Sequence, residues 1–139
     1  MILRIVNSVR ARLVGTEHKS YGRLEVNYRG VWGTVCQDGF TMVSANITCK
    51  QLGYVRGAIN FHGEAHYGPG NGTIWLTNVQ CRGNENNIAQ CSHSYWGETN
   101  CNHNDDVSIV CNPGNCNKPD HYYYKRFILI LFSYCYNVL

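Results

Sequence analysis

Six of the eight cysteines in this 139-residue chain lie between positions 36 and 111, and they are the side chains best suited to covalent chemistry. None belongs to a C-x-x-C pair, which argues against a thioredoxin-type redox centre and against a zinc ribbon. An even number of cysteines in so short a segment is typical of disulfide bonds formed in an oxidising compartment. Spacing alone leaves fifteen pairings open. The six are Cys36, Cys49, Cys81, Cys91, Cys101 and Cys111.

The histidines do not complete a catalytic motif, since neither G-x-S-x-G nor H-E-x-x-H occurs in the sequence. The pairs Cys91–His93 and Cys101–His103 lack the spacing of a closed zinc site. Cysteines that are joined in disulfides are not available as nucleophiles. We therefore expect a binding module without enzymatic activity.

The composition favours strands and turns over long helices. Charged residues make up only 15% of the chain and glycines number 14, whereas the hydrophobic share of 44% is too high for a disordered protein. The net charge of +3 is uneven: +4 in residues 1–35, −3 in residues 36–111 and +2 in residues 112–139. A nucleic-acid-binding domain usually carries a stronger basic stripe, so we expect no nucleic-acid partner.

Two glycosylation triplets agree with a secreted or cell-surface location. Asn46 and Asn71 each begin an N-x-[ST] triplet. Asn71 lies in the run GPGNG, which predicts an exposed turn. We therefore expect Asn71 to be the better acceptor of a glycan.

Hydrophobic periodicity predicts the elements that position these residues. Alternation of apolar and polar residues over 24–29 predicts a strand, which Gly30 joins to a returning strand at 31–35. Residues 43–53 are the best helix candidate, with Ser44 as the N-cap. The predicted fold class is α+β: a small curved antiparallel sheet that cradles one helix, with disulfides and long loops. Further strands are predicted at 73–79 and 107–111, and a short helix at 84–91.

We divide the chain into an N-terminal extension at 1–11, a domain at 12–112, and a linker with a hydrophobic tail at 113–139. The extension lacks the features of a secretory signal, which suggests a piece of a longer chain. The apolar run at 127–139 is shorter than the roughly 20 residues that span a bilayer. Three interpretations stay open: a truncated membrane helix, an artefactual end, and a strand or interfacial segment. Cys116 and Cys135 in this part pair with each other or with nothing.

The sequence resembles the scavenger receptor cysteine-rich (SRCR) domain family over residues 10–112. The matching stretches include GRLEVNYRGVWGTVCQDGF at 22–40, ITCKQLGY at 47–54 and CNHNDDVSIVC at 101–111. Members with eight cysteines carry one just before the GRLEV strand and one just after QLG. Ser20 and Tyr54 occupy those places here, so the chain resembles group A, the six-cysteine type. The pairing that the resemblance implies is Cys36–Cys101, Cys49–Cys111 and Cys81–Cys91.

The resemblance also implies a calcium site, formed in family members by an acidic pair after the first cysteine and an acid in the last motif. Gln37 and Asp38 stand at the first place and Asp105 at the second. Because an amide replaces one carboxylate, we expect weak calcium binding. The alternative is that Asp38 and Asp106 cap turns or pair with an arginine. A second cation site is disfavoured, because Thr77 and Asn78 stand where an acid is needed.

The function that the resemblance implies is ligand binding by an extracellular module of a scavenger-receptor-like or secreted defence protein. Its partners would be polyanions, microbial surfaces or an extracellular protein, with membrane association through the tail or through missing parts of the chain. The alternative is an accessory domain of a secreted protease or amine oxidase. We expect Trp32, Trp75 and Trp96 to lie in the core and not to form a ligand platform. The candidate polyanion-binding residues are Arg10, Arg12, Arg23 and Arg29, unless they form only a scattered solvated surface.

Overall fold

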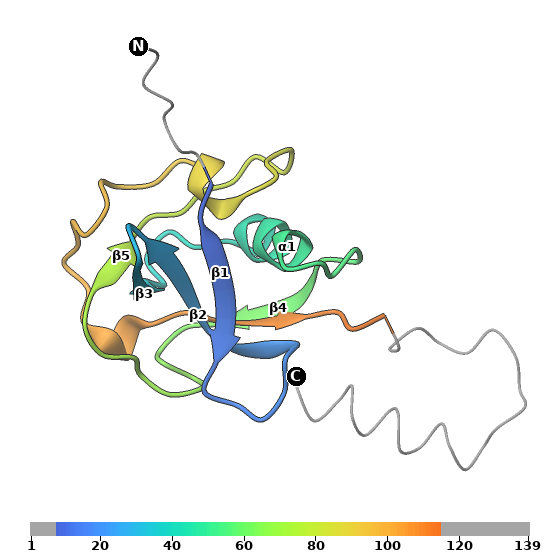
Figure 1. Ribbon diagram of the computed structural model, residues 1–139, viewed down its shortest axis with the longest axis horizontal. Helices are drawn as coiled ribbons and strands as arrows, with labels where there is room; N and C mark the ends of the chain where they lie inside the picture. Colours follow the sequence, from blue (N-terminus) through green and yellow to red (C-terminus); the bar gives the residue numbers. More distant parts are fainter. Residues whose placement is uncertain (1–7, 115–139) are drawn as a thin grey trace, which may run out of the picture.

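Strand β2 (Tyr21–Tyr28) organises the sheet, because three other strands pair with it. The computed structural model describes residues 8–114. Strand β1 (Arg10–Val14) pairs antiparallel along one side of β2. Strands β3 (Val31–Val35) and β6 (Ser108–Cys111) pair antiparallel with different parts of the other side. The sheet therefore curls around β2 (Figure 1).

Two shorter strands extend this sheet. Strand β4 (Ala58–His62) pairs antiparallel with β6, and β5 (Ile74–Leu76) pairs with β3, which gives the order β4-β6-β2-β3-β5. The predicted α+β class, with a curved sheet around one helix, is confirmed. One detail differs, since β5 runs parallel to β3. A parallel pair needs a long crossover, and the helix and β4 supply it here.

The predicted hairpin between β2 and β3 is confirmed, but its turn contains two residues, Arg29 and Gly30, and not Gly30 alone. Arg29 and Gly30 both have positive φ angles, of 52° and 83°. This is the backbone of the type I′ hairpin turn, whose twist matches that of the flanking strands. The Asn27 side chain also accepts a hydrogen bond from Gly30 N–H at 3.1 Å.

Helix α1 (Met42–Gln51) packs against β4 and β6. Its N-cap is Thr41, whose side chain accepts a hydrogen bond from Ser44 N–H at 3.2 Å, so the prediction of Ser44 as the cap was wrong. Ser44 is instead buried inside the first turn, where its hydroxyl donates to Val79 O at 2.9 Å. The hydroxyl of Ser44 thus ties the helix to the chain after β5.

The core lies between the helix and the concave side of the sheet, and three disulfides connect its parts. The bonds are the ones that the resemblance implied. The Cys49–Cys111 bond joins α1 to β6, and both cysteines are buried. Bonds that close loops of 62 and 65 residues stabilise the fold by about 4 kcal/mol each in the chain-entropy model. The core residues include Leu24, Val26, Val35, Ile47, Leu76, Val79, Ile88 and Ile109.

Several boundaries differ from the predicted ones. The predicted helix at 84–91 is a single 3₁₀ turn, η1 (Ile88–Gln90), and a second 3₁₀ turn, η2 (His103–Asp105), was not predicted. Strand β4 was not predicted either, because its alternation is short and all five of its residues are only half-buried. Strand β1 begins at Arg10, ahead of the domain boundary expected at residue 12.

The tail lies beyond the described part of the chain from residue 115 onward, together with Cys116 and Cys135. Within residues 8–114, no helix has the length and apolar character needed to cross a membrane.

The observed cap yields a direct test of the helix assignment. Replacing Thr41 with Ala removes the acceptor for Ser44 N–H, and we expect the free energy of unfolding to fall by about 0.5–2 kcal/mol. Val43→Ala is the matched control, because Val43 is 40% exposed at the first turn. Urea denaturation measures both variants. An equal loss in the two variants would contradict the capping role of Thr41.

Candidate functional site

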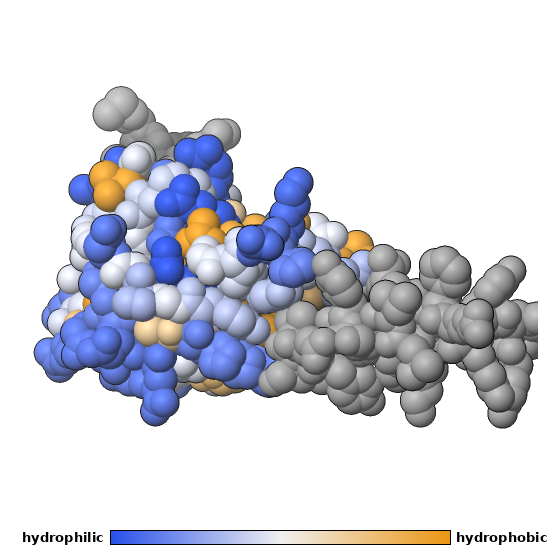
Figure 2. Space-filling view, turned by 90° about the horizontal axis from the view of Figure 1, so that it is seen from below, coloured by the Kyte–Doolittle hydropathy of each residue, from blue (hydrophilic) through white to orange (hydrophobic). Residues whose placement is uncertain are grey.

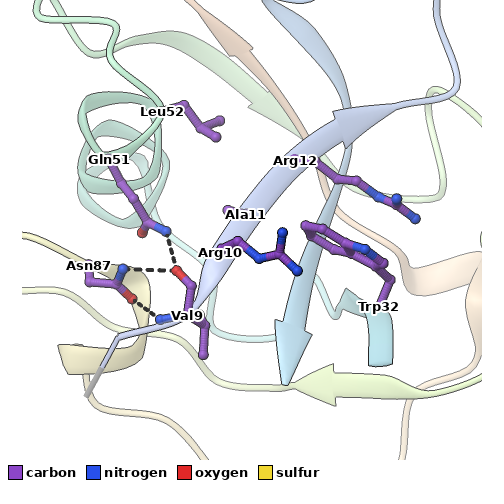
Figure 3. Close-up of a pocket in the computed structure, with 8 residues that line it drawn as sticks. All are labelled: Val9, Arg10, Ala11, Arg12, Trp32, Gln51, Leu52 and Asn87. Atoms are coloured by element: carbon purple, nitrogen blue, oxygen red, sulfur yellow. Dashed lines mark hydrogen bonds between the residues drawn. The ribbon is translucent and has the colours of Figure 1, made fainter. Parts of the chain in front are cut away.

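A groove of about 490 Å³ opens where β1 passes the end of α1 (Figure 3). Strand β1 crosses its middle, with the helix end on one side and the Trp32 ring on the other. We call this feature the β1 groove. It is lined by Val9, Arg10, Ala11, Arg12, Trp32, Gln51, Leu52 and Asn87.

Two arginines of β1 lie over the ring of Trp32. The guanidinium carbon of Arg12 is 4.1 Å from the ring centroid, and that of Arg10 is 5.5 Å away. Both contacts are within the range of a cation–π interaction. The register explains the arrangement, since Arg10 and Trp32 are both paired with Asn27 of β2 and so lie on the same face.

Glu25 determines which of the arginines retain free charge. This carboxylate is buried, and it accepts hydrogen bonds from Arg12 at 2.7 Å and from Arg23 at 3.1 Å. Arg23 also donates to Gly68 O at 3.1 Å. The guanidinium of Arg23 is therefore engaged by contacts within the domain. Arg10 forms no ion pair with an acid among residues 8–114.

Arg29 belongs to a different cluster of aromatic rings. Its guanidinium lies 5.1 Å from the ring of Tyr28, which stacks on Trp96 with centroids 4.1 Å apart. Trp75 meets both rings edge-on. Three of the four predicted arginines therefore contact aromatic rings, in two different ring systems, and only Arg10 and Arg12 line the β1 groove.

The tryptophans do not all lie where we expected. Trp75 and Trp96 are half-buried and pack against the core, but Trp32 lies on the opposite face beneath the two arginines. The alternation of β3 is the reason. Gly33 faces inward, where a Cβ would lie 2.4 Å from the Trp75 ring, so its neighbour Trp32 faces outward. The sequence signal that was missed is the glycine next to Trp32, because a glycine leaves room for the Trp75 ring on the inward face.

Two amide side chains bind the backbone of Val9, the residue just before β1. Asn87 Oδ1 accepts a hydrogen bond from Val9 N–H at 3.1 Å. Gln51 Nε2 donates to Val9 O at 2.8 Å. Gln51 and Asn87 were not predicted as site residues, because nothing in the sequence links the helix end to residue 9. Their bonds hold β1, and with it Arg10, in a fixed position.

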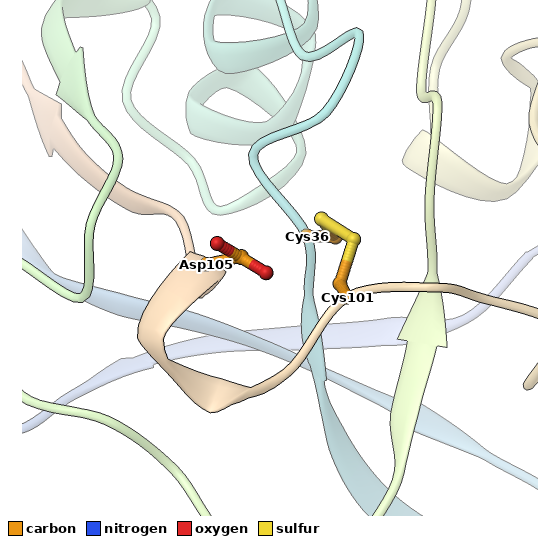
Figure 4. Close-up of side chains that lie close together, drawn as sticks. All are labelled: Cys36, Cys101 and Asp105. Carbon is orange, nitrogen blue, oxygen red and sulfur yellow. A yellow bond between two sulfur atoms is a disulfide. The ribbon is translucent and has the colours of Figure 1, made fainter.

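Two of the predicted cation-binding residues, Asp38 and Asp105, lie beside the Cys36–Cys101 disulfide, and Figure 4 shows Asp105 there. Asp105 has a carboxylate oxygen within 4.8 Å of both sulfurs, and Asp38 Oδ2 is 3.6 Å from Cys101 Sγ. Because both sulfurs are oxidised, these are contacts and not hydrogen bonds. Gln37 Oε1 instead accepts the N–H of Glu64 at 2.5 Å.

The carboxylate of Asp105 is partly engaged as well. One of its oxygens accepts Asn102 N–H at 3.0 Å in a capping box of η2. The exposed carboxylate of Asp38 and the second oxygen of Asp105 are left to face solvent or a cation.

Half-buried His103 and fully buried Asp106 form an ion pair that contacts the loop 63–73. The Asp106 side chain is fully buried, and its Oδ2 lies 2.9 Å from His103 Nδ1 and accepts Gly70 N–H at 2.7 Å. His103 Nε2 lies 3.0 Å from Gly72 O. Since both ring nitrogens face acceptors, the geometry fits the doubly protonated imidazole. Burial disfavours that charge, but the bonds to Gly72 and Asp106 outweigh burial and raise the pKa of His103.

Two stacked histidines, His62 and His66, lie near the start of the same loop. The rings of His62 and His66 stack with centroids 4.1 Å apart, and His62 Nε2 is buried without a hydrogen-bond partner among residues 8–114. Tyr67 faces both rings edge-on. Burial, and secondly the proximity of His66, lower the pKa of His62. This environment therefore favours the neutral form of His62.

The two predicted glycosylation sites differ in accessibility. Asn46 lies in α1, half-buried, and its Oδ1 accepts Ala58 N–H at 3.1 Å. Asn71 lies exposed in the loop before β5 and forms no hydrogen bond within residues 8–114. The face of the molecule in Figure 2 is mainly hydrophilic, with small separate hydrophobic spots.

Comparison with known proteins places these features in a family. The model for the scavenger receptor cysteine-rich domain matches residues 14–112. Lysyl oxidase homolog 2 of Xenopus laevis is 47% identical over 109 residues, which cover 78% of this chain and 14% of that protein. Lysyl oxidase homolog 4 of Homo sapiens is 44% identical, with the same two coverages. The chain thus spans about a seventh of the length of these curated relatives.

A solved structure shows the same architecture. The third SRCR domain of murine neurotrypsin has a TM-score of 0.68 and 41% sequence identity. The match covers 75% of this chain and 96% of the neurotrypsin domain.

The histidine pair predicts how stability depends on pH. Because the folded state lowers the pKa of His62, the unfolded chain takes up a proton first as the pH falls below about 6.5, and stability is lost. We expect His62→Phe to reduce this acid-induced loss in thermal denaturation. His93→Gln is the control and should leave it unchanged. An unchanged acid dependence in His62→Phe would exclude the pair as its source.

Proposed function

The chain belongs to the scavenger receptor cysteine-rich domain family, and on that premise we propose that it is an extracellular module that binds anionic ligands in the β1 groove. Arg10 is the observation that carries this proposal. Its guanidinium is exposed, lies over Trp32 and has no acidic partner within residues 8–114. Three disulfides fit an oxidising compartment outside the cytosol.

The parent protein that we favour is a secreted enzyme of the lysyl oxidase homologue kind, in which this module is an accessory domain without catalytic residues. The 47% and 44% identities to two such proteins support this reading over a scavenger receptor. The full-length transcript distinguishes the two. An oxidase domain in it would support the enzyme, and a collagenous or coiled-coil stalk would support the receptor.

The distribution of charge favours local recognition over long-range attraction. Residues 8–114 contain eight Lys or Arg and eight Asp or Glu side chains, so this part of the chain carries no net charge. A ligand must therefore find its favourable contacts in the groove itself. Arg10 and Arg12 supply two guanidinium groups there, of which only Arg12 is partly neutralised by Glu25. Carboxylate or sulfate groups fit this fork geometry.

Substitution of the groove arginines tests the proposal. We expect Arg10→Ala and Arg12→Ala each to weaken binding to a sulfated polysaccharide about two- to fivefold, or about 0.4–1 kcal/mol. Surface plasmon resonance at two salt concentrations measures this, and binding should weaken as salt screens the charges. Arg56→Ala is the matched control, since it removes an equal charge from an exposed site outside the groove. An equal effect in the control would contradict recognition by the groove.

We also propose weak calcium binding beside the Cys36–Cys101 disulfide. The residues present fit calcium only in part. Calcium takes about six to eight oxygen ligands, whereas Asp38 offers a full carboxylate and Asp105 offers one free oxygen. The oxygen of Gln37 is already engaged by Glu64 N–H. Water and backbone oxygens would have to complete the shell, which favours affinity in the millimolar range of extracellular modules.

The calcium proposal rests on one carboxylate that can be removed without disturbing the core. Asp38 is exposed, so we expect Asp38→Ala to fold and to abolish the heat of calcium binding in calorimetry. Glu98→Ala removes an exposed carboxylate elsewhere and serves as the control. Identical binding heats for Asp38→Ala and the parent protein would refute the site.

A further inference from the structure

We propose that Asn71 is a site of spontaneous deamidation and that a glycan on the same side chain protects it. Asn71 and Gly72 are both exposed, and a Cβ on Gly72 would have no described residue within 4 Å apart from its two neighbours in the chain. Gly72 N–H forms no hydrogen bond within the described residues. The nucleophile and the side-chain amide are therefore both free of competing contacts.

The reaction needs only water. The Gly72 nitrogen attacks the side-chain carbonyl carbon of Asn71, which forms a five-membered succinimide. The Cγ–Nδ2 bond breaks, and ammonia leaves with the proton that the Gly72 nitrogen loses. Water then opens the ring at either carbonyl, which gives aspartate or isoaspartate. Glycine favours the step, because no side chain blocks its nitrogen.

The two fates of Asn71 compete for one atom. Nδ2 is the atom that carries an N-linked glycan and also the atom that leaves as ammonia. A glycosylated Asn71 would have to expel a sugar-bearing amine, so the glycan slows the reaction. Conversely, deamidation destroys the triplet that glycosylation requires. The proposed protection by a glycan rests on the extracellular location proposed above, whereas the deamidation reaction itself does not.

Deamidation at Asn71 would affect the contacts of its two neighbours in the chain. The residues on either side of Asn71 are fixed, since Gly70 N–H donates to Asp106 at 2.7 Å and Gly72 O lies 3.0 Å from His103. Isoaspartate inserts an additional carbon into the main chain between these two anchors. Aspartate adds a negative charge next to Gly70, whose N–H binds the buried carboxylate of Asp106. We therefore expect either product to disturb the loop where it contacts the His103–Asp106 pair.

Two substitutions at Thr73 separate the two fates. Thr73→Ala removes the glycosylation triplet and keeps Asn71 followed by Gly72, whereas Thr73→Ser preserves both. The backbone carbonyl of Thr73 accepts Thr34 N–H at 3.0 Å, and neither substitution removes it. Both variants are secreted from eukaryotic cells, incubated at physiological pH and temperature, and digested for mass spectrometry. Asn84 is the internal reference, because it is exposed and is followed by Glu85.

In Thr73→Ala we expect Asn71 to deamidate about tenfold faster than Asn84, a difference of about 1.4 kcal/mol in activation free energy. Adding Gly72→Ala to that variant should remove most of this difference. In the glycosylated Thr73→Ser protein, Asn71 should remain intact. Equal rates at Asn71 and Asn84 in Thr73→Ala would overturn the reactive site. Absence of a glycan on Asn71 in Thr73→Ser, or equal Asn71 rates in the two variants, would overturn protection alone.

Discussion

The position of the loop 63–73 depends on the hydrogen bonds of one buried residue, Asp106. It receives hydrogen bonds from Gly70 and His103, and its backbone carbonyl accepts Ala65 N–H at 3.0 Å. Its neighbour in the chain, Val107, donates to Val35 O and accepts from Leu24 N–H. A buried charge is stable only when it is paired and hydrogen-bonded. The carboxylate of Asp106 therefore joins the loop 63–73 to the last 3₁₀ turn, and the backbone of Val107 attaches strands β2 and β3 beside it.

Much of the fold could be predicted, because its strongest determinants are local. The hairpin at Gly30, the helix after Thr41 and the final strand each leave a periodic pattern in the sequence. The short strand β4 and the parallel pairing of β5 leave no such pattern, since they arise from contacts between distant segments. The Ser44 cap was wrong for a related reason. A serine one turn into a helix is indistinguishable by type from a cap, and only its contact with Val79 shows that it is buried.

The residue types of the site could be predicted from the sequence, but not which of its arginines are free to bind a ligand. Four arginines were expected to act together, yet Glu25 takes part of the charge of Arg12 and all of Arg23 is held by the fold. The burial of Glu25 beneath two arginines could not be predicted, because it depends on contacts across neighbouring strands. Trp32 illustrates the same limit, because its surroundings are set by pairing across three strands. Arg10 remains accessible, because it is exposed and contacts the Trp32 ring without an ion pair to any acid among residues 8–114.

The disulfides also determine what happens when the chain is cut. Cys36 lies at the end of β3, and Cys101 lies just before the last 3₁₀ turn. Every loop between them, including 53–57, 63–73 and 82–87, lies inside the ring that this bond closes. A protease that cleaves one of these loops produces two fragments that remain covalently joined. Such a nicked domain keeps its sheet partners in reach of one another, so its surface loops can be trimmed outside the cell without releasing a piece of the core.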